Sequence, residues 1–282
     1  MTEIEYQIME FKKATIIVSV YDNVDFLKLI LDSLKQQSIQ SFEIIISEDG
    51  NNPKMKEFIE TYSFSNDYKH LTLEDIGWRK NTALNNAIRN ASGEWLIFID
   101  GDCVLHPRFV EMHLRYAKDN VILSGRRVKL DEKSSKELQE KSPESIRKMQ
   151  YSILKKLFFG KGDVLYIEEG FFVSPKSLLF FIPKLRKFNY LLGCNMSFSK
   201  KAIYSINGFD ETYINPSVGE DTDIAWRFKA LGYKMKSLRN LAVQYHLYHP
   251  KNWTTNKENK DKMLLNQKQN KYFCEQGLVK VQ

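Results

Sequence analysis

Short apolar runs alternate with amphipathic segments through the first part of the chain. The apolar runs are rich in β-branched residues, which is typical of buried strands, and they span residues 14–21, 42–47, 69–74 and 94–100. Between them, apolar side chains recur every three or four residues, which is typical of helices that cover a sheet. This alternation predicts an α/β fold with helices on both faces of a parallel sheet.

Polar caps and prolines mark where the intervening helices begin. Asp22 or Asn23 is a candidate N-cap for the first helix, and Pro53 suits the first position of the second. Pro107 opens the helix after the fourth strand.

The second half of the chain is less regular. Residues 121–130, 193–199 and 240–250 resemble strands. Residues 132–159 are expected to form a charged helix, and residues 219–232 a second one that ends at a glycine.

The composition suits a globular, enzyme-sized protein, because 43% of the 282 residues are hydrophobic. Three cysteines without a CxxC pair argue against a disulfide framework and a structural zinc site. Acidic residues stand where a signal peptide has a basic region, and no apolar run is long enough to span a bilayer. The expected location is therefore the cytoplasm.

Positive charge is concentrated in one region. The net charge is +7, and residues 126–190 carry this whole excess. Such a region suits an anionic lipid surface or a phosphorylated substrate; nucleic acid is disfavoured because no nucleic-acid-reading module is visible. Together with an apolar stripe over residues 146–157, it predicts peripheral contact with the inner face of the cytoplasmic membrane. Packing of the stripe on the protein's own core, or on a second subunit, is the alternative, and the oligomeric state stays open.

Asp100 and Asp102 stand one glycine apart, directly after a buried strand. Their carboxylates suit Mg²⁺ or Mn²⁺, and Gly101 lets the backbone turn so that both face one point. A solvated turn is the structural alternative. In parallel sheets, ligands bind beyond the carboxyl ends of the strands, which favours the metal site.

Other charged residues have both a functional and a structural interpretation. Arg79 and Lys80 suit phosphate groups or a surface turn. Glu220 and Asp221 suit a general base or a helix dipole. His246, with His249 as the fallback, suits a metal ligand or a structural histidine.

The segments "SVYDNVDFLKLILDSLKQQSIQSFEIIISEDG", "NTALNNAIRNASGEWLIFIDGDC", "GCNMSFSKKAIYSINGFDE" and "GEDTDIAWRF" resemble, in this order, a family 2 glycosyltransferase with a galactosyltransferase-type C-terminal region. The resemblance covers roughly residues 14–250. It implies a GT-A fold, which is a single Rossmann-like mixed sheet flanked by helices. The implied cofactor is Mn²⁺ or Mg²⁺.

The resemblance also implies roles for individual residues. Asp221 is the implied base, and Glu220 contacts the acceptor or the donor sugar. Asp102, Asp100 and His246 are the implied metal ligands. The expected nucleotide-sugar-binding residues are Val20, Tyr21, Glu48, Asp49, Arg79, Lys80, Asn85, Asp100, Gly101, Asp102, Gly193 and Asn195.

The expected domain spans residues 1–250. Residues 12–124 form its nucleotide-sugar half, residues 125–190 a basic helical insertion and residues 191–250 its acceptor half. Residues 251–282 are expected to be a C-terminal tail or lid.

The leading hypothesis is a metal-dependent, inverting hexosyltransferase. It would move a sugar from a UDP-sugar to a glycan or lipid-linked acceptor in bacterial polysaccharide or lipopolysaccharide synthesis. A sugar-phosphate nucleotidyltransferase and a non-catalytic glycan- or lipid-binding relative are the alternatives. The dinucleotide, P-loop and nucleophile-elbow signatures are absent from the sequence.

Overall fold

The structure is a computed structural model that describes residues 12–140, 155, 163–250 and 256–280. The strands are β1 (Ala14–Val20), β2 (Phe42–Glu48), β3 (Tyr68–Leu71), β4 (Trp95–Asp100), β5 (Cys103–Leu105), β6 (Val121–Ser124), β7 (Val128–Lys129), β8 (Met196–Ser199), β9 (Lys234–Ser237) and β10 (Gln244–His246). The helices are α2 (Val24–Lys35), α3 (Pro53–Thr61), α4 (Lys80–Asn90), α5 (Phe109–Arg115), α6 (Glu132–Glu140), α8 (Phe181–Leu185), α9 (Lys200–Ser205), α10 (Asp221–Ala230) and α11 (Lys257–Lys268), with 3₁₀ turns η1 (Ile167–Glu169) and η2 (Leu178–Phe180).

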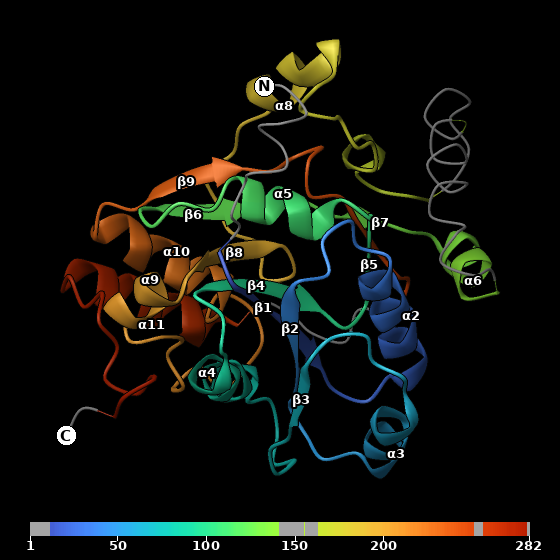
Figure 1. Ribbon diagram of the computed structural model, residues 1–282. Helices are drawn as coiled ribbons and strands as arrows, with labels where there is room; N and C mark the ends of the chain where they lie inside the picture. Colours follow the sequence, from blue (N-terminus) through green and yellow to red (C-terminus); the bar gives the residue numbers. More distant parts are fainter. Residues whose placement is uncertain (1–11, 141–154, 156–162, 251–255, 281–282) are drawn as a thin grey trace.

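A seven-stranded mixed sheet in the order β3-β2-β1-β4-β8-β6-β9 forms the centre of the molecule (Figure 1). The first four strands run parallel, while β8 runs antiparallel to both β4 and β6. The predicted mixed sheet flanked by helices is therefore confirmed. The parallel strands end together, because Val20 pairs with Glu48 and Ser19 pairs with Asp100.

Alternate residues of each central strand face two separate cores. Ile16 and Val18 of β1 belong to the core that α2, α3 and α5 cover. Ile17, between them, belongs to the opposite core, which α4, α9 and α10 cover. Side chains in a strand alternate between faces, so a strand with apolar residues at every position must be covered on both sides. This explains why the strands read as continuous apolar runs.

A second sheet of three short strands, in the order β5-β10-β7, lies beside the carboxyl end of β4. Strand β5 begins one residue after Asp102. Strand β10 pairs with it antiparallel, with His246 opposite Cys103, and pairs with β7 in parallel. This small sheet brings residues from the two halves of the chain together.

Several predicted boundaries differ from the structure. The predicted strand at 121–130 is two strands, β6 and β7, interrupted at residues 125–127. The predicted strand at 193–199 begins only at Met196. The helix expected from Pro107 begins two residues later, at Phe109, and Arg108 occupies its N-cap position. Of the helix expected over 132–159, the structure describes α6 and residue 155; the apolar stripe at 146–157 otherwise lies outside the described residues.

The segment expected to be a tail or lid contains α11, and its described part packs against the domain. The amide of Asn259 donates to the carbonyls of Asn215 and Ser217. Cys274 and Leu278 are buried, and the Asn207 amide donates to the carbonyls of Cys274 and Val279. Among the described residues, no helix combines the length and apolar character that crossing a bilayer requires.

Candidate active site

A cavity of about 640 Å³ opens at the carboxyl ends of β1 and β4. Pockets of this size hold small-molecule ligands and cofactors. Its lining includes seven of the residues expected to bind a nucleotide-sugar, namely Val20, Tyr21, Asp49, Lys80, Asp100, Gly101 and Asp102. Asn23, Phe26, Trp78 and His249 also line it.

Gly101 is required by the close approach of the chain to β1. Its N–H donates to the Ser19 carbonyl at 2.7 Å. A Cβ at this position would lie 2.7 Å from Cγ1 of Val20 and 3.1 Å from the Ser19 oxygen. Only glycine lets the chain turn this tightly between Asp100 and Asp102.

Asp102, His246 and His249 form a cluster of possible metal ligands, called the ligand cluster below. One ligand atom from each lies within 4.8 Å of the others. Nε2 of His246 is 3.2 Å, and Nε2 of His249 is 3.1 Å, from the same Oδ2 of Asp102. Backbone pairing sets this geometry, because the Leu247 N–H donates to the Asp102 carbonyl at 2.8 Å.

The chemistry of the ligand cluster fits a divalent transition metal. One carboxylate oxygen and two imidazole nitrogens suit Mn²⁺ better than Mg²⁺, which prefers ligands that are all oxygen. The pKa of Asp102 lies well below its usual value: burial acts to raise it, but hydrogen bonds from His246 and His249 outweigh burial. The carboxylate is therefore ionised and available as a ligand.

Asp100 points to different partners from Asp102. Its Oδ1 is 2.8 Å from Nζ of Lys80, and its Oδ2 is 3.7 Å from a guanidinium nitrogen of Arg127. Asp100 is not a member of the ligand cluster, although it was expected to be a metal ligand. The two aspartates therefore tolerate each other because cations neutralise one and imidazoles surround the other.

Lys80 joins the two ends of the site. Its Nζ contacts Oδ1 of Asp100 at 2.8 Å and Oε2 of Glu220 at 3.0 Å. Burial acts to lower the pKa of Lys80, but the two carboxylates outweigh burial and raise it, so the amine stays charged. Burial raises the pKa of Glu220 to about 7, with Lys80 opposing the shift and Asp100 and Asp221 adding to it.

Asp221 begins α10, and the neighbouring loop holds its side chain. The Gly193 N–H donates to Oδ2 at 3.0 Å, and the Thr222 hydroxyl donates to Oδ1 at 3.1 Å. These two bonds fix the orientation of the carboxylate. A Cβ on Gly193 would lie 2.3 Å from Oε1 of Glu220, so only glycine fits beside this pair of acids.

Five of the expected binding residues do not line the cavity, and Gly193, beside Asp221, is one of them. Glu48 is fully buried, 2.6 Å from Nε2 of His70, and accepts the Asn52 N–H at the start of α3. The Arg79 N–H donates to Asp49, while its guanidinium donates to the Glu74 carbonyl.

The other two, Asn85 and Asn195, are buried. Asn195 donates to the carbonyls of Arg126 and Ala242 and lies 3.0 Å from Nε2 of His113.

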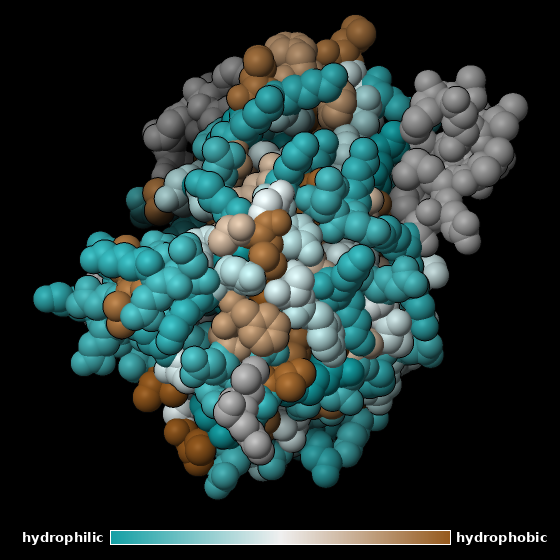
Figure 2. Space-filling view, turned by 90° about the vertical axis from the view of Figure 1, so that its left-hand side faces the viewer, coloured by the Kyte–Doolittle hydropathy of each residue, from teal (hydrophilic) through white to brown (hydrophobic). Residues whose placement is uncertain are grey.

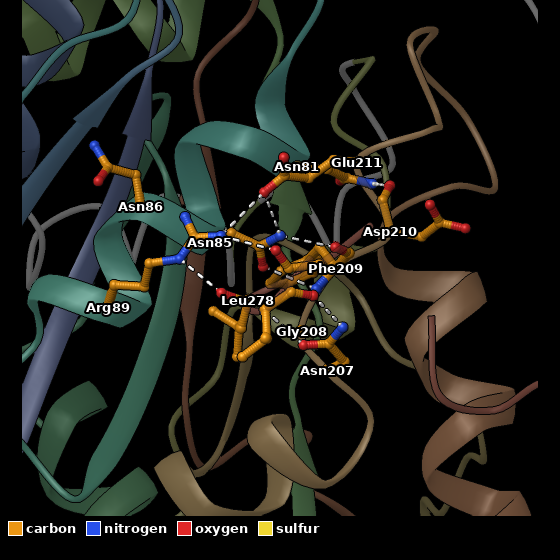
Figure 3. A network of polar contacts seen from close by, with 12 residues as sticks. Asn81, Asn85, Asn86, Arg89, Asn207, Gly208, Phe209, Asp210, Glu211 and Leu278 are labelled. Carbon is orange, nitrogen blue, oxygen red and sulfur yellow. Dashed lines mark hydrogen bonds and ion pairs between the residues drawn. The ribbon is translucent and has the colours of Figure 1, made fainter. Parts of the chain in front are cut away.

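Asn85 belongs to a polar network that fixes α4 against residues 207–211 (Figure 3). Its amide nitrogen donates to the Phe209 carbonyl at 2.8 Å, and its oxygen accepts the Phe209 N–H at 2.9 Å. Asn81 donates to the carbonyls of Asp210 and Gly219, and Arg89 donates to those of Gly277 and Leu278. Because Lys80 begins α4 and Glu220 follows Gly219, this network holds both ends of the Lys80–Glu220 pair.

Sequence reasoning missed Arg127 and the joint participation of both histidines. Arg127 lies in an unpaired stretch between two short strands, where no periodicity indicates the direction of a side chain. His246 ends β10 and His249 lies three residues beyond it, and this spacing does not indicate that both side chains meet Asp102. The basic "RR" pair after an apolar run was the only available signal.

The sequence matches two protein-family models. Residues 15–182, more than half of the chain, match the model described as Glycosyl transferase family 2. Residues 183–250 match the model described as N-terminal domain of galactosyltransferase. The two matches together span residues 15–250, which include the residues that line the cavity and the Glu220–Asp221 pair.

Curated and solved proteins show the same likeness. Validoxylamine A glucosyltransferase of Streptomyces hygroscopicus subsp. jinggangensis (strain 5008) is 22% identical over 233 residues, which are 78% of this chain and 52% of that protein. The chain spans a third to two thirds of the length of this and two other curated relatives.

Two solved structures share the fold. The mannosyltransferase PcManGT of Pyrobaculum calidifontis, in complex with GDP-Man and Mn²⁺, has a TM-score of 0.55 at 14% identity, covering 87% of this chain and 59% of its own. GalNAc-T7 with UDP, GalNAc and Mn²⁺ has a TM-score of 0.61 at 11% identity, covering 91% and 48%. At these identities the likeness establishes the fold, which is the GT-A fold.

Proposed function

Because the chain belongs to glycosyl transferase family 2, we propose that it transfers a hexose from a UDP-sugar to a hydroxyl group of a glycan or lipid-linked acceptor. The observation that carries the proposal is the arrangement of the cavity. Asp102 and His249 of the ligand cluster line it together with Lys80, and Lys80 links Asp100 to the Glu220–Asp221 pair beside it. A transferase needs these two functions, stabilisation of a leaving group and activation of a nucleophile, on opposite sides of one sugar.

The donor occupies the cavity at the carboxyl ends of β1 and β4. Tyr21 and Asp49 lie on the side of α4 and β2, where a nucleoside fits. The diphosphate lies toward Asp102 and Lys80, because Lys80 is a cation beside the Asp100–Asp102 turn. Neighbouring structures contain either GDP-Man or UDP, so the UDP preference rests on the family resemblance and is tested below.

Asp102, His246 and His249 would hold a divalent cation, and their nitrogen-rich donor set favours Mn²⁺ over Mg²⁺. Such a cation supplies positive charge for the diphosphate that leaves when the glycosidic bond breaks. Asp100 acts beside this site as a positioning residue that holds Lys80 in place.

Asp221 accepts the proton of the acceptor hydroxyl as that oxygen forms its bond to the anomeric carbon. Two hydrogen bonds hold its carboxylate in a fixed orientation. Glu220 cannot take this role while it is paired with Lys80, and it positions the donor sugar instead. Attack from the side opposite the leaving diphosphate inverts the anomeric centre.

The proposed setting is bacterial polysaccharide or lipopolysaccharide synthesis, in the cytoplasm at the inner face of the cytoplasmic membrane. The support is the concentration of positive charge in residues 126–190.

A panel of UDP-, GDP-, ADP- and CMP-sugars tests the activity, with Mn²⁺, Mg²⁺ or EDTA and with release of the free nucleotide as the readout. We expect release from one UDP-hexose, dependent on the metal and strongest with Mn²⁺. Asp221→Asn should lose transfer but keep donor binding. The comparison variant Asp223→Asn should lower stability instead, because Asp223 pairs with Arg227 in the core. No turnover or binding of any UDP-sugar would refute the proposal, and pyrophosphate release from UTP plus a sugar phosphate would indicate a nucleotidyltransferase.

A further inference from the structure

Apolar side chains project from the surface at η2 and α8, away from both cores. Leu178 is 96% exposed and Leu185 is 77% exposed, and Leu179 and Phe181 beside them are exposed too. Figure 2 shows apolar side chains gathered at the top of the molecule, where α8 lies in Figure 1. Single exposed leucines are ordinary, but four large apolar side chains within eight residues indicate a surface that contacts something.

The fold holds this segment rigidly. Pro183 is buried, and Phe180 packs against the core that α2, α3 and α5 cover. The Ser237 hydroxyl donates to the Arg186 carbonyl, and the Arg186 guanidinium is 3.1 Å from Glu169. The projecting side chains are therefore presented on a fixed support and not on a loose loop.

A basic cavity of about 600 Å³ lies directly behind these side chains. Lys184, Lys187 and Lys236 line it, together with the rings of Tyr116 and Phe188. None of the three lysines pairs with a carboxylate among the described residues, whereas Arg186 and Arg239 nearby both pair with Glu169. Burial lowers the pKa of Lys236, and the neighbouring charges of Lys118 and Lys184 lower it further.

We propose that this surface docks the protein on a bilayer of anionic phospholipids. Leu178, Phe181 and Leu185 enter the acyl-chain boundary, and Lys184, Lys187 and Lys236 contact the lipid phosphates. The inference deepens the proposed function, because it identifies the surface that would meet the membrane carrying a lipid-linked acceptor. It concerns residues that are distinct from the catalytic cavity.

Charge decides between a lipid surface and a second copy of the chain. In a twofold dimer the same lysines would face each other, and like charges across an interface destabilise it. An anionic bilayer complements both the apolar side chains and the lysines. Each lysine close to such a surface strengthens binding about fivefold, and this contribution weakens at high salt.

Vesicle flotation tests the proposal with the full chain. We expect it to float with vesicles of 30% phosphatidylglycerol in phosphatidylcholine, about 100-fold more than with pure phosphatidylcholine because each of three lysines contributes about fivefold, and less in high salt. Leu178→Ser/Leu185→Ser should reduce binding about tenfold, and Lys184→Glu/Lys187→Glu should reduce it about 25-fold or more. The matched controls are Leu264→Ser/Leu265→Ser on α11 and Lys54→Glu/Lys56→Glu on α3, which should bind as the unchanged protein does.

Three outcomes would overturn the inference: no flotation of the unchanged protein, equal flotation with neutral vesicles, or equal loss in the control variants. A dimer in light scattering that Leu178→Ser/Leu185→Ser dissociates would overturn it in favour of a second copy. Circular dichroism and donor hydrolysis without vesicles are measured on each variant. Donor hydrolysis by an unchanged protein that does not float would mean that this inference fails while the proposed function stands.

Discussion

The two ends of the candidate site are built in different ways. At the ligand cluster, backbone pairing between β5 and β10 places Asp102 beside His246. At the opposite end, side-chain amides of α4 hold the segments in place. Asn81 donates to the carbonyl of Gly219, the residue before Glu220, and Asn85 donates to the carbonyl of Phe209. A register is hard to perturb by one substitution, whereas an amide network depends on each member.

Different kinds of substitution should therefore damage the two ends. Loss of a ligand should remove both metal and donor binding. Loss of the base should remove transfer and leave donor binding, and loss of an amide should lower stability before it lowers activity.

Asp102→Ala should have the largest effect. It removes the one carboxylate of the ligand cluster, so Mn²⁺ binding should be lost and transfer should fall about 10³-fold or more. Calorimetric titration with Mn²⁺ and nucleotide-release kinetics measure the two losses. If Asp102→Ala binds Mn²⁺ as before, the cluster is not the metal site.

Asp221→Asn should lower kcat for transfer by about 10²- to 10³-fold, because the carboxylate that accepts the hydroxyl proton is lost. The affinity for donor and Mn²⁺ should change little, since the Asp221 partners within the described part of the chain are Gly193 and Thr222 and not the ligand cluster. Equal loss of donor affinity and kcat would assign Asp221 to donor binding.

Asn85→Ala should lower the free energy of unfolding by about 2–3 kcal/mol, because it leaves buried backbone groups of Phe209 without partners. Chemical denaturation measures this loss. The control is Asn86→Ala, the next residue on α4, whose side chain bonds only to Asn90 of the same helix. If both variants are equally stable, the network in Figure 3 does not hold the two segments together.

His249→Ala should weaken Mn²⁺ binding about tenfold, and His246→Ala should weaken it more. His246 is fixed in β10, whereas His249 lies beyond the strand and its side chain is 41% exposed. Titration with Mn²⁺ compares the two. A stronger effect of His249→Ala would mean that β10 pairing does not set the geometry of the cluster.

Glu220→Gln should remove a small pH dependence of stability. The folded protein keeps the Glu220 proton up to about pH 7, while the unfolded chain releases it near its ordinary pKa of 4.5. Stability attributable to Glu220 therefore falls as pH rises, by about 1 kcal/mol between about pH 5.5 and 6.5, and levels off above 7. Denaturation across this range checks it, and parallel curves for the two proteins would contradict the assigned pKa.

The donor half was predictable because its strands are buried on both faces. Continuous apolar runs such as residues 14–20 and 95–100 allow one interpretation, and turn residues place Asp100 and Asp102 at the sheet edge. Asp49, which follows β2, is then expected at the same edge because parallel strands end together, whereas the sequence left Lys80 open between a phosphate contact and a surface turn.

Other features depend on contacts that periodicity does not encode. Strand β8 runs antiparallel within the sheet, and β7 has only two residues, so neither its partner nor the direction of Arg127 follows from the sequence. Asn85 and Asn195 are polar residues in family motifs, yet their amides satisfy buried carbonyls. A sequence does not distinguish an amide that binds substrate from one that binds backbone.

The pairing of β5 with β10 also bears on how the protein acquires metal during synthesis. Asp102 emerges from the ribosome well before His246, and a loop of more than 140 residues must close before the two meet. A growing chain that ends before residue 246 contains only one residue of the ligand cluster, Asp102, and a single carboxylate binds a transition metal only weakly. On the proposed function, the cluster captures a cation only once residues 183–250 have emerged and β10 has docked, so metal loading would report that both ends of the site are joined.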